Sequence, residues 1–215
     1  MLLKTKNLMK AFGGLKAINK VDFELPAGEI RGIIGPNGSG KSTFFNLVSG
    51  VYDPDPGSYI EFDGHDITNE PPHKIGALGL SRTFQLLRLY QDMSVINNVM
   101  SGYHTRVKYK FFDAVIGRKK IWDQEKEIKD EMMELLSFVG LADYAELNAS
   151  ELSGGQRRLL VLARAIAMKP KLLMLDEPAA GLSPVNVDNL MKIIMQLKDK
   201  YGLTLIIIEH ILKVV

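Results

Sequence analysis

Residues 35–43 carry the most specific chemistry in the chain, because their types and spacing suit a phosphate group. They read Gly-Pro-Asn-Gly-Ser-Gly-Lys-Ser-Thr, which is a glycine, four residues and then Gly-Lys-Ser. The glycines let backbone N–H groups turn toward an anion, Lys41 can reach the outer phosphates, and the Ser42 hydroxyl can bind Mg²⁺. The expected nucleotide contacts are Gly35, Pro36, Asn37, Gly38, Ser39, Gly40, Lys41, Ser42 and Thr43.

The segments on either side of this loop have the character that such a loop needs. Ile30–Ile34 is an apolar run, interrupted by Arg31 and Gly32, that predicts a buried strand. Thr43–Val51 predicts a helix, whose first turn adds a partial positive charge beside the loop. This strand–loop–helix context favours a nucleotide site over a glycine-rich turn that binds nothing.

Two adjacent carboxylates, Asp176 and Glu177, follow a second apolar run, Leu172–Leu175. Acidic groups at the end of a buried strand are costly unless cations or hydrogen bonds compensate them. Side chains alternate along a strand, so we expect the two acids to point in different directions. One carboxylate can then hold a metal ion while the other faces a water molecule.

The segment Leu152-Ser153-Gly154-Gly155-Gln156 opens a predicted helix that ends before Pro170. Ser153 is placed to cap this helix, and the two glycines leave backbone N–H groups uncovered. By itself the segment is a well-capped helix. Its chemistry also suits a second anion site built from backbone donors.

Three further residues mean little in isolation. Phe12 precedes two glycines and is expected in a loop between the first strands, where position alone favours a core or turn aromatic. Gln85 ends the segment Arg82-Thr83-Phe84-Gln85, and a glutamine there is most often a surface amide. His210 follows the apolar run Leu203–Ile208, and a lone histidine after a strand is usually structural.

Composition excludes several classes of protein. The 215 residues suit one domain, or one domain with a subdomain, and 46% hydrophobic with 24% charged residues is ordinary for a globular protein. A net charge of +2 gives no argument for binding nucleic acid. The absence of cysteine excludes disulfides and suits a reducing cytosol. No apolar run is long enough to cross a bilayer, so a membrane role requires a partner.

The order of predicted elements divides the chain into a core and an insertion. Val21, Phe23 and Leu25 alternate with acidic residues, and Tyr59–Phe62 precedes an Asp-Gly turn, so a small antiparallel sheet is expected beside the nucleotide strand. Apolar residues at helical spacing predict a long helix that ends at Gly140: Ile128, Met132, Leu135, Leu136 and Val139. We therefore expect an α/β fold with a core at 1–85 and 151–215 and a helical subdomain at 86–150.

The helical insertion contains a basic, aromatic patch whose role stays open. It comprises Arg106, Lys108, Tyr109, Lys110, Phe111, Phe112, Arg118, Lys119, Lys120 and Trp122. One interpretation is a solvated charged face over buried aromatic rings. The other is a docking surface near lipid headgroups or a membrane-embedded partner.

Taken in order, these motifs resemble those of the ATP-binding cassette (ABC) ATPases. The phosphate loop, Gln85, LSGGQ at 152–156, Asp176-Glu177 and His210 follow one another at the family's separations, and the resemblance spans nearly the whole sequence. It implies a P-loop NTPase core with a mainly parallel sheet, an antiparallel β subdomain and a helical insertion subdomain. It also implies ATP and Mg²⁺ as ligands.

The resemblance assigns expected roles to individual residues. Phe12 matches the aromatic residue that stacks on adenine, and Ser42, Gln85 and Asp176 match the neighbours of Mg²⁺. Glu177 matches the residue that polarises the attacking water, and His210 matches the histidine that contacts the γ-phosphate. The implied catalytic set is Glu177, His210, Gln85 and Lys41.

In this family the signature motif completes the nucleotide site of the opposite subunit, so Ser153, Gly154, Gly155 and Gln156 are expected to act in trans. The chain has one phosphate loop and one signature motif. The resemblance therefore implies a head-to-tail dimer with ATP at the interface, formed with an identical or a different ATPase subunit. Hydrolysis would then let the two halves part.

Two departures from the family pattern are visible. The loop after Pro178 ends in Ser183, where many members have aspartate. The sequence also ends at Val215, just beyond His210, so either it is a piece of a longer chain or the further strands and helices that relatives carry after the histidine are absent.

Within the family, Arg82-Thr83-Phe84-Gln85, the run Glu177–Leu182 and the long insertion after Gly102 are most similar to the branched-chain amino acid uptake ATPases. The implied partners are transmembrane permease subunits and a solute-binding protein, with the chain cytoplasmic and peripheral on the inner face of the membrane. Lipopolysaccharide-export ATPases share part of this pattern. A soluble ABC ATPase of DNA repair or the ribosome, or a nucleotide-binding regulator without turnover, is the rival interpretation.

Overall fold

The computed structural model describes residues 1–83, 89–103 and 118–209, with side chains from 125 onward in the last range. The chain falls into two compact units, residues 1–85 with 170–215 and residues 86–169. The segment 151–169 groups with the helical unit, whereas the division expected from the sequence places it with the core.

One sheet of the first unit is antiparallel, with the order β2-β1-β4-β5. In β2, Val21 and Phe23 are half-buried and Leu25 is buried, while the acidic residues between them are exposed, which confirms the predicted alternation. The predicted hairpin is confirmed by the pairing of Phe62 with His65. The strands are β1 (Leu3–Phe12), β2 (Leu15–Leu25), β4 (Tyr59–Phe62) and β5 (His65–Asp66).

The other sheet of this unit is parallel, with the order β3-β8-β7-β6. Every residue of β7 and β8 is buried, as expected for central strands covered on both faces. The two sheets together with the helices confirm the expected α/β class. The strands are β3 (Ile30–Ile34), β6 (Leu80–Arg82), β7 (Leu172–Asp176) and β8 (Thr204–Glu209).

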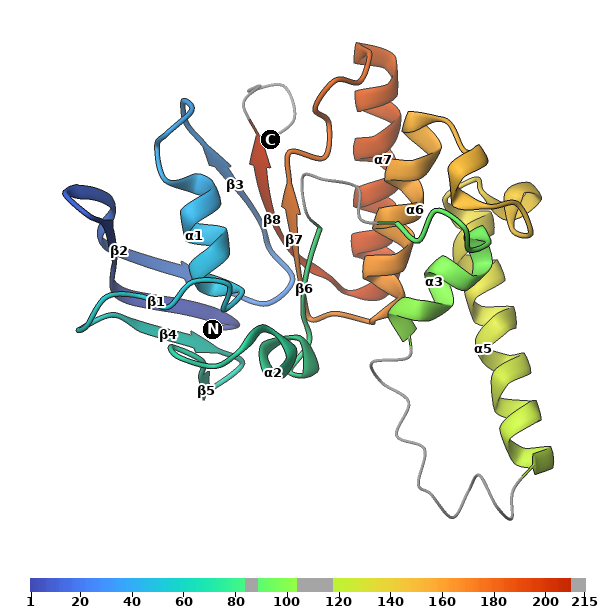
Figure 1. The fold of residues 1–215 in the computed structure, drawn as a ribbon, viewed down its shortest axis with the longest axis horizontal. Helices are drawn as coiled ribbons and strands as arrows, with labels where there is room; N and C mark the ends of the chain where they lie inside the picture. Colours follow the sequence, from blue (N-terminus) through green and yellow to red (C-terminus); the bar gives the residue numbers. More distant parts are fainter. Residues whose placement is uncertain (84–88, 104–117, 210–215) are drawn as a thin grey trace. The chain divides into compact units, whose positions relative to one another are not determined.

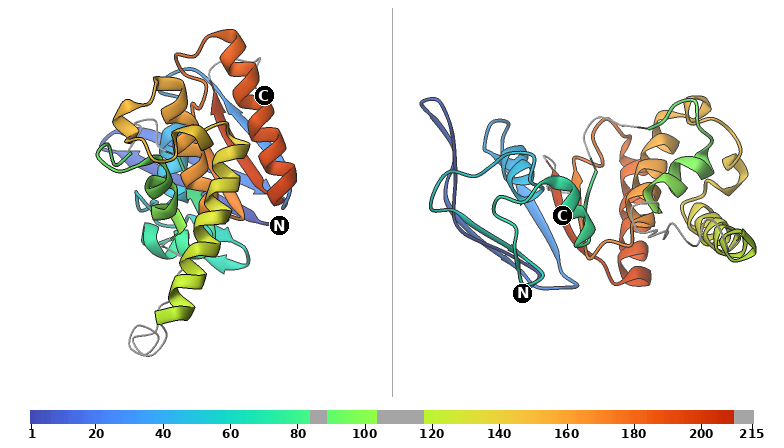
Figure 2. Two further views of the ribbon diagram at one scale, coloured as in Figure 1. Left: turned by 90° about the vertical axis from the view of Figure 1, so that its right-hand side faces the viewer. Right: turned by 60° about the horizontal axis from the view of Figure 1, so that its bottom comes forward.

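Helix α1 (Lys41–Val48) lies between the two sheets of this unit, as Figures 1 and 2 show. Its residues Phe44, Phe45, Leu47 and Val48 belong to a buried cluster that includes apolar residues from both sheets. The helix begins two residues earlier than predicted and ends three residues earlier, because Ser49 caps it and Gly50 turns the chain at φ 71°. This shared core fixes the start of α1 against the parallel sheet.

Helix α7 (Pro184–Tyr201) lies on the side of the parallel sheet away from α1 (Figure 1). Ser183 and Pro184 begin it, and Gly202, at φ 63°, ends it. A short helix, α2 (Pro72–Ala77), precedes β6.

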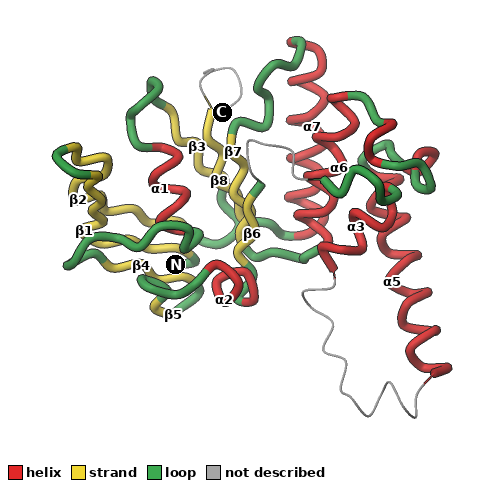
Figure 3. Tube along the Cα trace, viewed as in Figure 1, coloured by secondary structure: helices red, strands yellow, loops and turns green. Residues whose placement is uncertain are grey.

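The described residues of the second unit form helices and loops (Figure 3). Its elements are α3 (Val95–Tyr103), α5 (Arg118–Phe138), α6 (Gly154–Ala167) and the single turns η2 (Ala142–Tyr144) and η3 (Ala149–Glu151). The predicted apolar stripe on α5 is confirmed from Met132 to Val139, and Gly140 at φ 74° ends the helix region. At Gly102 a side chain would meet the Arg164 carbonyl, so glycine lets α3 and α6 approach closely.

Much of the basic, aromatic patch lies outside the described residues. Residues 104–117 are not described, and of residues 118–122 the structure gives the helical backbone of α5. Both interpretations of the patch therefore stay predictions. Among the helices that the structure describes, none has the length and apolar character needed to cross a membrane.

Candidate nucleotide site

The phosphate loop connects β3 to α1 and takes a conformation that depends on glycine. Gly38 and Gly40 have φ values of 79° and 91°, in the region that L side chains rarely adopt. A Cβ at Gly40 would also lie 2.5 Å from the Ala17 carbonyl oxygen. Gly40 is therefore required both for the turn and for the close approach of β2.

Lys41, the first residue of α1, is buried and folds back over this loop. Its Nζ donates hydrogen bonds to the carbonyl oxygens of Gly35 (2.7 Å) and Pro36 (2.9 Å). The ammonium group is thus held inside the loop, beside the N-terminus of a helix whose first turn has no acidic residue. This concentrates positive charge where an anion would bind.

The parallel sheet brings the acidic pair to the same edge as this loop. Ile33 and Asp176 are both level with Ile208, on the strands that flank β8. Two strand spacings separate them, which is about 9.6 Å. The phosphate loop begins two residues after Ile33, so Asp176 and the loop lie at neighbouring strand ends.

Asp176 is buried and paired with a cation that the sequence analysis did not identify. Its Oδ2 lies 2.9 Å from Nη2 of Arg82, and both side chains are less than a tenth exposed. Thr83 accepts a hydrogen bond of 3.4 Å from the Asp176 N–H through Oγ1. The sequence offered one signal for this pair: Arg82 ends a short apolar segment that is expected to be buried, and a buried arginine needs a partner of opposite charge.

Glu177 lies beyond the end of β7, so strand alternation does not set its direction as expected. Its backbone is left-handed, at φ 50°, and its N–H donates to the Ile208 carbonyl oxygen (3.0 Å). This turn redirects the chain after Asp176. The two acids are therefore separated by a change of backbone conformation and not by the alternation of a strand.

A second buried carboxylate, Glu209, holds the loop that follows Glu177. Glu209 is the last residue of β8 and is 3% exposed, and its Oε1 accepts a hydrogen bond from the Ala179 N–H (3.0 Å). No role for Glu209 was predicted from the sequence. Its signal was an acidic residue directly after an apolar run, the same signal that identified Asp176.

Phe12 is the last residue of β1, so the prediction that it lies in a loop was wrong. It pairs with Leu15 across the turn that the two glycines make. The residue is 45% exposed, and its ring meets Tyr52 edge to face, with 5.5 Å between centroids. An exposed ring supported by a second aromatic side chain can stack on a base, and Tyr52 was not identified from the sequence.

The remaining predicted residues of this edge fall outside the described residues. Gln85 lies in 84–88 and His210 lies in 210–215. Their described neighbours are Thr83, which follows β6, and Glu209, which ends β8. Both strands belong to the parallel sheet described above.

The signature segment lies in the second unit, at the start of α6. Ser153 caps this helix as predicted. Its Oγ accepts from the Gln156 N–H (3.4 Å), and its own N–H donates to the Gln156 side chain (2.9 Å). Ser153 and Gly154 are exposed. The segment is thus a capping box whose first turn is open to solvent.

Comparison with known protein families shows which family has this arrangement of motifs. The family model described as "ABC transporter" matches residues 18–180, a span that includes the phosphate loop, the signature segment and the acidic pair.

The chain belongs to the ABC transporter family.

Relatives within the family align over the whole chain. A probable branched-chain amino acid transport ATP-binding protein LivG from Archaeoglobus fulgidus is 43% identical over 218 residues, which cover 100% of this chain and 81% of the relative. The high-affinity branched-chain amino acid transport ATP-binding protein LivG of Escherichia coli is 38% identical over 214 residues and 84% of its length.

Solved ABC cassettes have the same fold. The ADP conformation of MJ1267, described as an ATP-binding cassette of an ABC transporter, matches with a TM-score of 0.83 at 35% identity, over 99% of this chain and 82% of that one. The dimeric structure of the cassette MJ0796 matches with a TM-score of 0.81 at 23% identity, over 99% and 90%, and shows the fold alone. The predicted family and fold class are confirmed.

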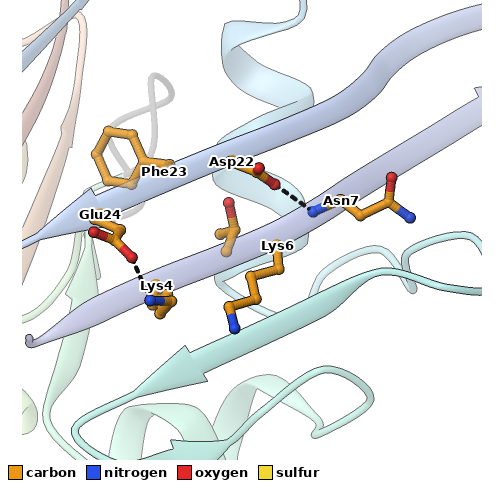
Figure 4. Close-up of a pocket in the computed structure, with 7 residues that line it drawn as sticks. Lys4, Lys6, Asn7, Asp22, Phe23 and Glu24 are labelled. Atoms are coloured by element: carbon orange, nitrogen blue, oxygen red, sulfur yellow. Dashed lines mark hydrogen bonds and ion pairs between the residues drawn. The ribbon is translucent and has the colours of Figure 1, made fainter.

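A groove of about 470 Å³ lies elsewhere in this ABC cassette and is lined by residues of the paired strands β1 and β2 (Figure 4). Three of its charged groups are already engaged: Lys4 pairs with Glu24, and Asp22 accepts a hydrogen bond from the Asn7 N–H at 2.6 Å. The hydrogen bond from Lys4 lowers the pKa of the Glu24 carboxyl and raises that of Lys4. The groove includes no predicted site residue; it is lined by Lys4, Thr5, Lys6, Asn7, Asp22, Phe23 and Glu24.

Proposed function

We propose that the chain is the ATP-hydrolysing, nucleotide-binding subunit of a membrane transporter that imports branched-chain amino acids. The observation that carries the proposal is the sheet edge of the first unit, where the phosphate loop with Lys41 lies two strands from Asp176 and Glu177. Family membership and the names of the full-length relatives support the transporter class.

ATP binding is assigned to the phosphate loop and Phe12. In the structure Lys41 donates to loop carbonyl groups. A triphosphate would offer its ammonium stronger, charged acceptors, so we expect Lys41 to exchange these partners for phosphate oxygens. The exposed Phe12 ring, with Tyr52 at its edge, would stack on the base.

The donor set predicted for the metal fits Mg²⁺. This ion prefers oxygen ligands, of which one or two come from protein groups and the rest from phosphates and water. Asp176 offers a carboxylate, Ser42 a hydroxyl and Gln85 an amide oxygen. When bound, Mg²⁺ would neutralise charge on the phosphates.

Hydrolysis is assigned to Glu177 as the residue that orients the attacking water. The proton of that water has to pass to a base as the oxygen bonds to the γ-phosphorus and the bond to the β-phosphate oxygen breaks. Lys41 stabilises the developing charge. The roles of Gln85 near Mg²⁺ and His210 at the γ-phosphate remain predictions from the family pattern.

The signature residues Ser153, Gly154, Gly155 and Gln156 are proposed to complete the site of a second ATPase subunit. Support comes from their position in the open first turn of α6, where backbone N–H groups can meet a phosphate. The second subunit can be a copy of this chain or a different ATPase. ATP would then lie at the interface between the two.

The permease subunits, a solute-binding protein and a position on the cytoplasmic face of the membrane are proposed from the transporter class. Branched-chain amino acids are named as the transported compounds of the relatives at 38% and 43% identity. Lipopolysaccharide export and a soluble ABC ATPase remain the alternatives.

A reconstitution experiment tests the transport proposal. The protein would be isolated from its native membranes with its spanning partners and placed in vesicles. ATP would be supplied on the side of the membrane that carries the ATPase subunit, and labelled leucine, valine, glutamate or lysine on the other side. ATP-dependent accumulation of leucine and valine is expected, and the Lys41→Ala variant should abolish it. ATP hydrolysis with no accumulation of leucine or valine would reject the import of branched-chain amino acids.

A further inference from the structure

The ion pair between Arg82 and Asp176 joins the proposed Mg²⁺ carboxylate to a fixed internal cation. Nη2 of Arg82 lies 2.9 Å from Oδ2 of Asp176, and the two side chains are 7% and 6% exposed. A carboxylate this deeply buried needs a cationic partner or a proton. In the structure that partner is Arg82.

Helix α1 holds the Arg82 guanidinium in place. Nη1 donates to Oδ1 of Asn46 at 2.6 Å and to Oγ of Ser49 at 3.2 Å, and the guanidinium lies 5.3 Å from the centre of the Phe45 ring. Ser49 is itself fixed by a bond from its hydroxyl to the Phe45 carbonyl oxygen (2.7 Å). The cation, which comes from β6, is therefore held by the helix that follows the phosphate loop and by its C-cap residue.

The strand geometry explains why these groups meet. Met174 belongs to the buried cluster that contains α1, and residues two apart on a strand share a face, so Asp176 lies on the α1 side of the sheet. Arg82 pairs with Met174 in the register of β6 and β7. Its long side chain thus reaches forward to Asp176 and across to α1.

The pairing engages one carboxylate oxygen. Arg82 contacts Oδ2, and within the described parts of the chain no group donates a hydrogen bond to Oδ1. The fixed guanidinium therefore sets the orientation of the carboxylate and leaves its other oxygen for a further ligand. It also lowers the negative charge that an incoming divalent cation meets.

We propose that Arg82 is the resident counter-ion of Asp176, and that it orients this carboxylate and weakens its attraction for the Mg²⁺ that binds with nucleotide. Arg82 is thus a positioning residue that acts through Asp176. The inference rests on the proposed role of Asp176 at the Mg²⁺ site.

The measurement is the factor by which Mg²⁺ tightens ADP binding, because ADP is not hydrolysed at this site. The dissociation constant of ADP is determined calorimetrically in EDTA and in saturating MgCl₂, and the ratio of the two is the coupling factor. In Arg82→Met, Asp176 loses its counter-ion, and Mg²⁺ compensates a charge that is otherwise buried and unpaired. The coupling factor should rise about tenfold.

Two further variants separate charge from structure. Arg82→Lys keeps the cation but cannot bridge Asp176 and α1 with a fork of donors, and its coupling factor should stay within about twofold of the unchanged protein. Arg31→Met is the matched control, since Arg31 is also a strand arginine in an ion pair, with Glu29, but is 44% exposed. Its coupling factor should not change.

The possible outcomes test the nucleotide site and the counter-ion role of Arg82 separately. Absence of ADP binding in the unchanged protein would reject the proposed function itself. If ADP binds and the coupling factor is the same in the unchanged protein and in Arg82→Met, the counter-ion role is rejected but the nucleotide site is not. An equal rise in Arg82→Lys and Arg82→Met would also reject it, because the cation would then not be the cause. If Arg82→Met does not fold, Asn46→Asp, which gives Arg82 a competing carboxylate, should raise the coupling factor, and an unchanged factor there would reject the role.

Discussion

Adding a methyl group at Gly40, in the phosphate loop, should destabilise the protein more than adding one at a glycine with a similar backbone angle elsewhere. Gly40→Ala places a β-carbon 2.5 Å from the Ala17 carbonyl oxygen while the backbone stays at φ 91°. The left-handed backbone costs a non-glycine residue about 1–2 kcal/mol, and the overlap with a main-chain atom adds about 1–3 kcal/mol. We expect a total loss of about 2–5 kcal/mol in the free energy of unfolding.

Gly64→Ala is the matched control for this prediction. Gly64 has φ 77° and open space around its β-carbon position, so it should show the backbone cost alone, about 1–2 kcal/mol. Urea unfolding without nucleotide measures both variants. ADP binding should weaken in Gly40→Ala and stay unchanged in Gly64→Ala, because only the first lies in the phosphate loop. Equal unfolding free energies, or unchanged ADP affinity in Gly40→Ala, would refute the argument that β2 and the loop are held at this distance.

Three smaller predictions address residues around the site. Tyr52→Ala removes the edge contact to Phe12 and should weaken ADP binding by about 2–10-fold, with inorganic triphosphate affinity unchanged in calorimetry. Ser153→Ala removes a capping side chain and should cost about 1 kcal/mol in urea unfolding, whereas Ser183→Ala, at a cap with no side-chain hydrogen bond, should cost less; the reverse order would contradict the cap assignment. Glu209→Ala leaves a buried N–H without its acceptor and should cost about 1–3 kcal/mol, while Glu209→Gln keeps an oxygen there and should cost less than half as much by the same assay.

Local patterns predicted most of the fold. The alternation in β2, the apolar runs of β7 and β8, the stripe on α5 and the cap of α6 are set by residues near one another in sequence, and the structure confirms them. The phosphate loop was also predictable, because its chemistry is contained in nine consecutive residues.

The contacts that shape the site were not predictable from local sequence. Arg82 and Asp176 are 94 residues apart, and Glu209 reaches a loop 30 residues away. Phe12 was expected in a loop because two glycines follow it, but the pairing of β1 with β2 extends to Phe12 itself. Each of these contacts depends on which strands become neighbours. The sequence shows that a buried charge needs a partner, but it does not show which residue that partner is.

The central claim is that ATP bound at the end of the parallel sheet is hydrolysed with Glu177 orienting the water. The most direct test is Glu177→Gln, which keeps the size of the side chain and removes its charge, measured for ATP affinity and turnover beside Glu127→Gln, a change at an exposed position on α5. We expect ATP affinity within about twofold of the unchanged protein and a fall in turnover of about 10²–10⁴-fold for Glu177→Gln alone. Undiminished turnover in that variant, or equal losses in both, would contradict it.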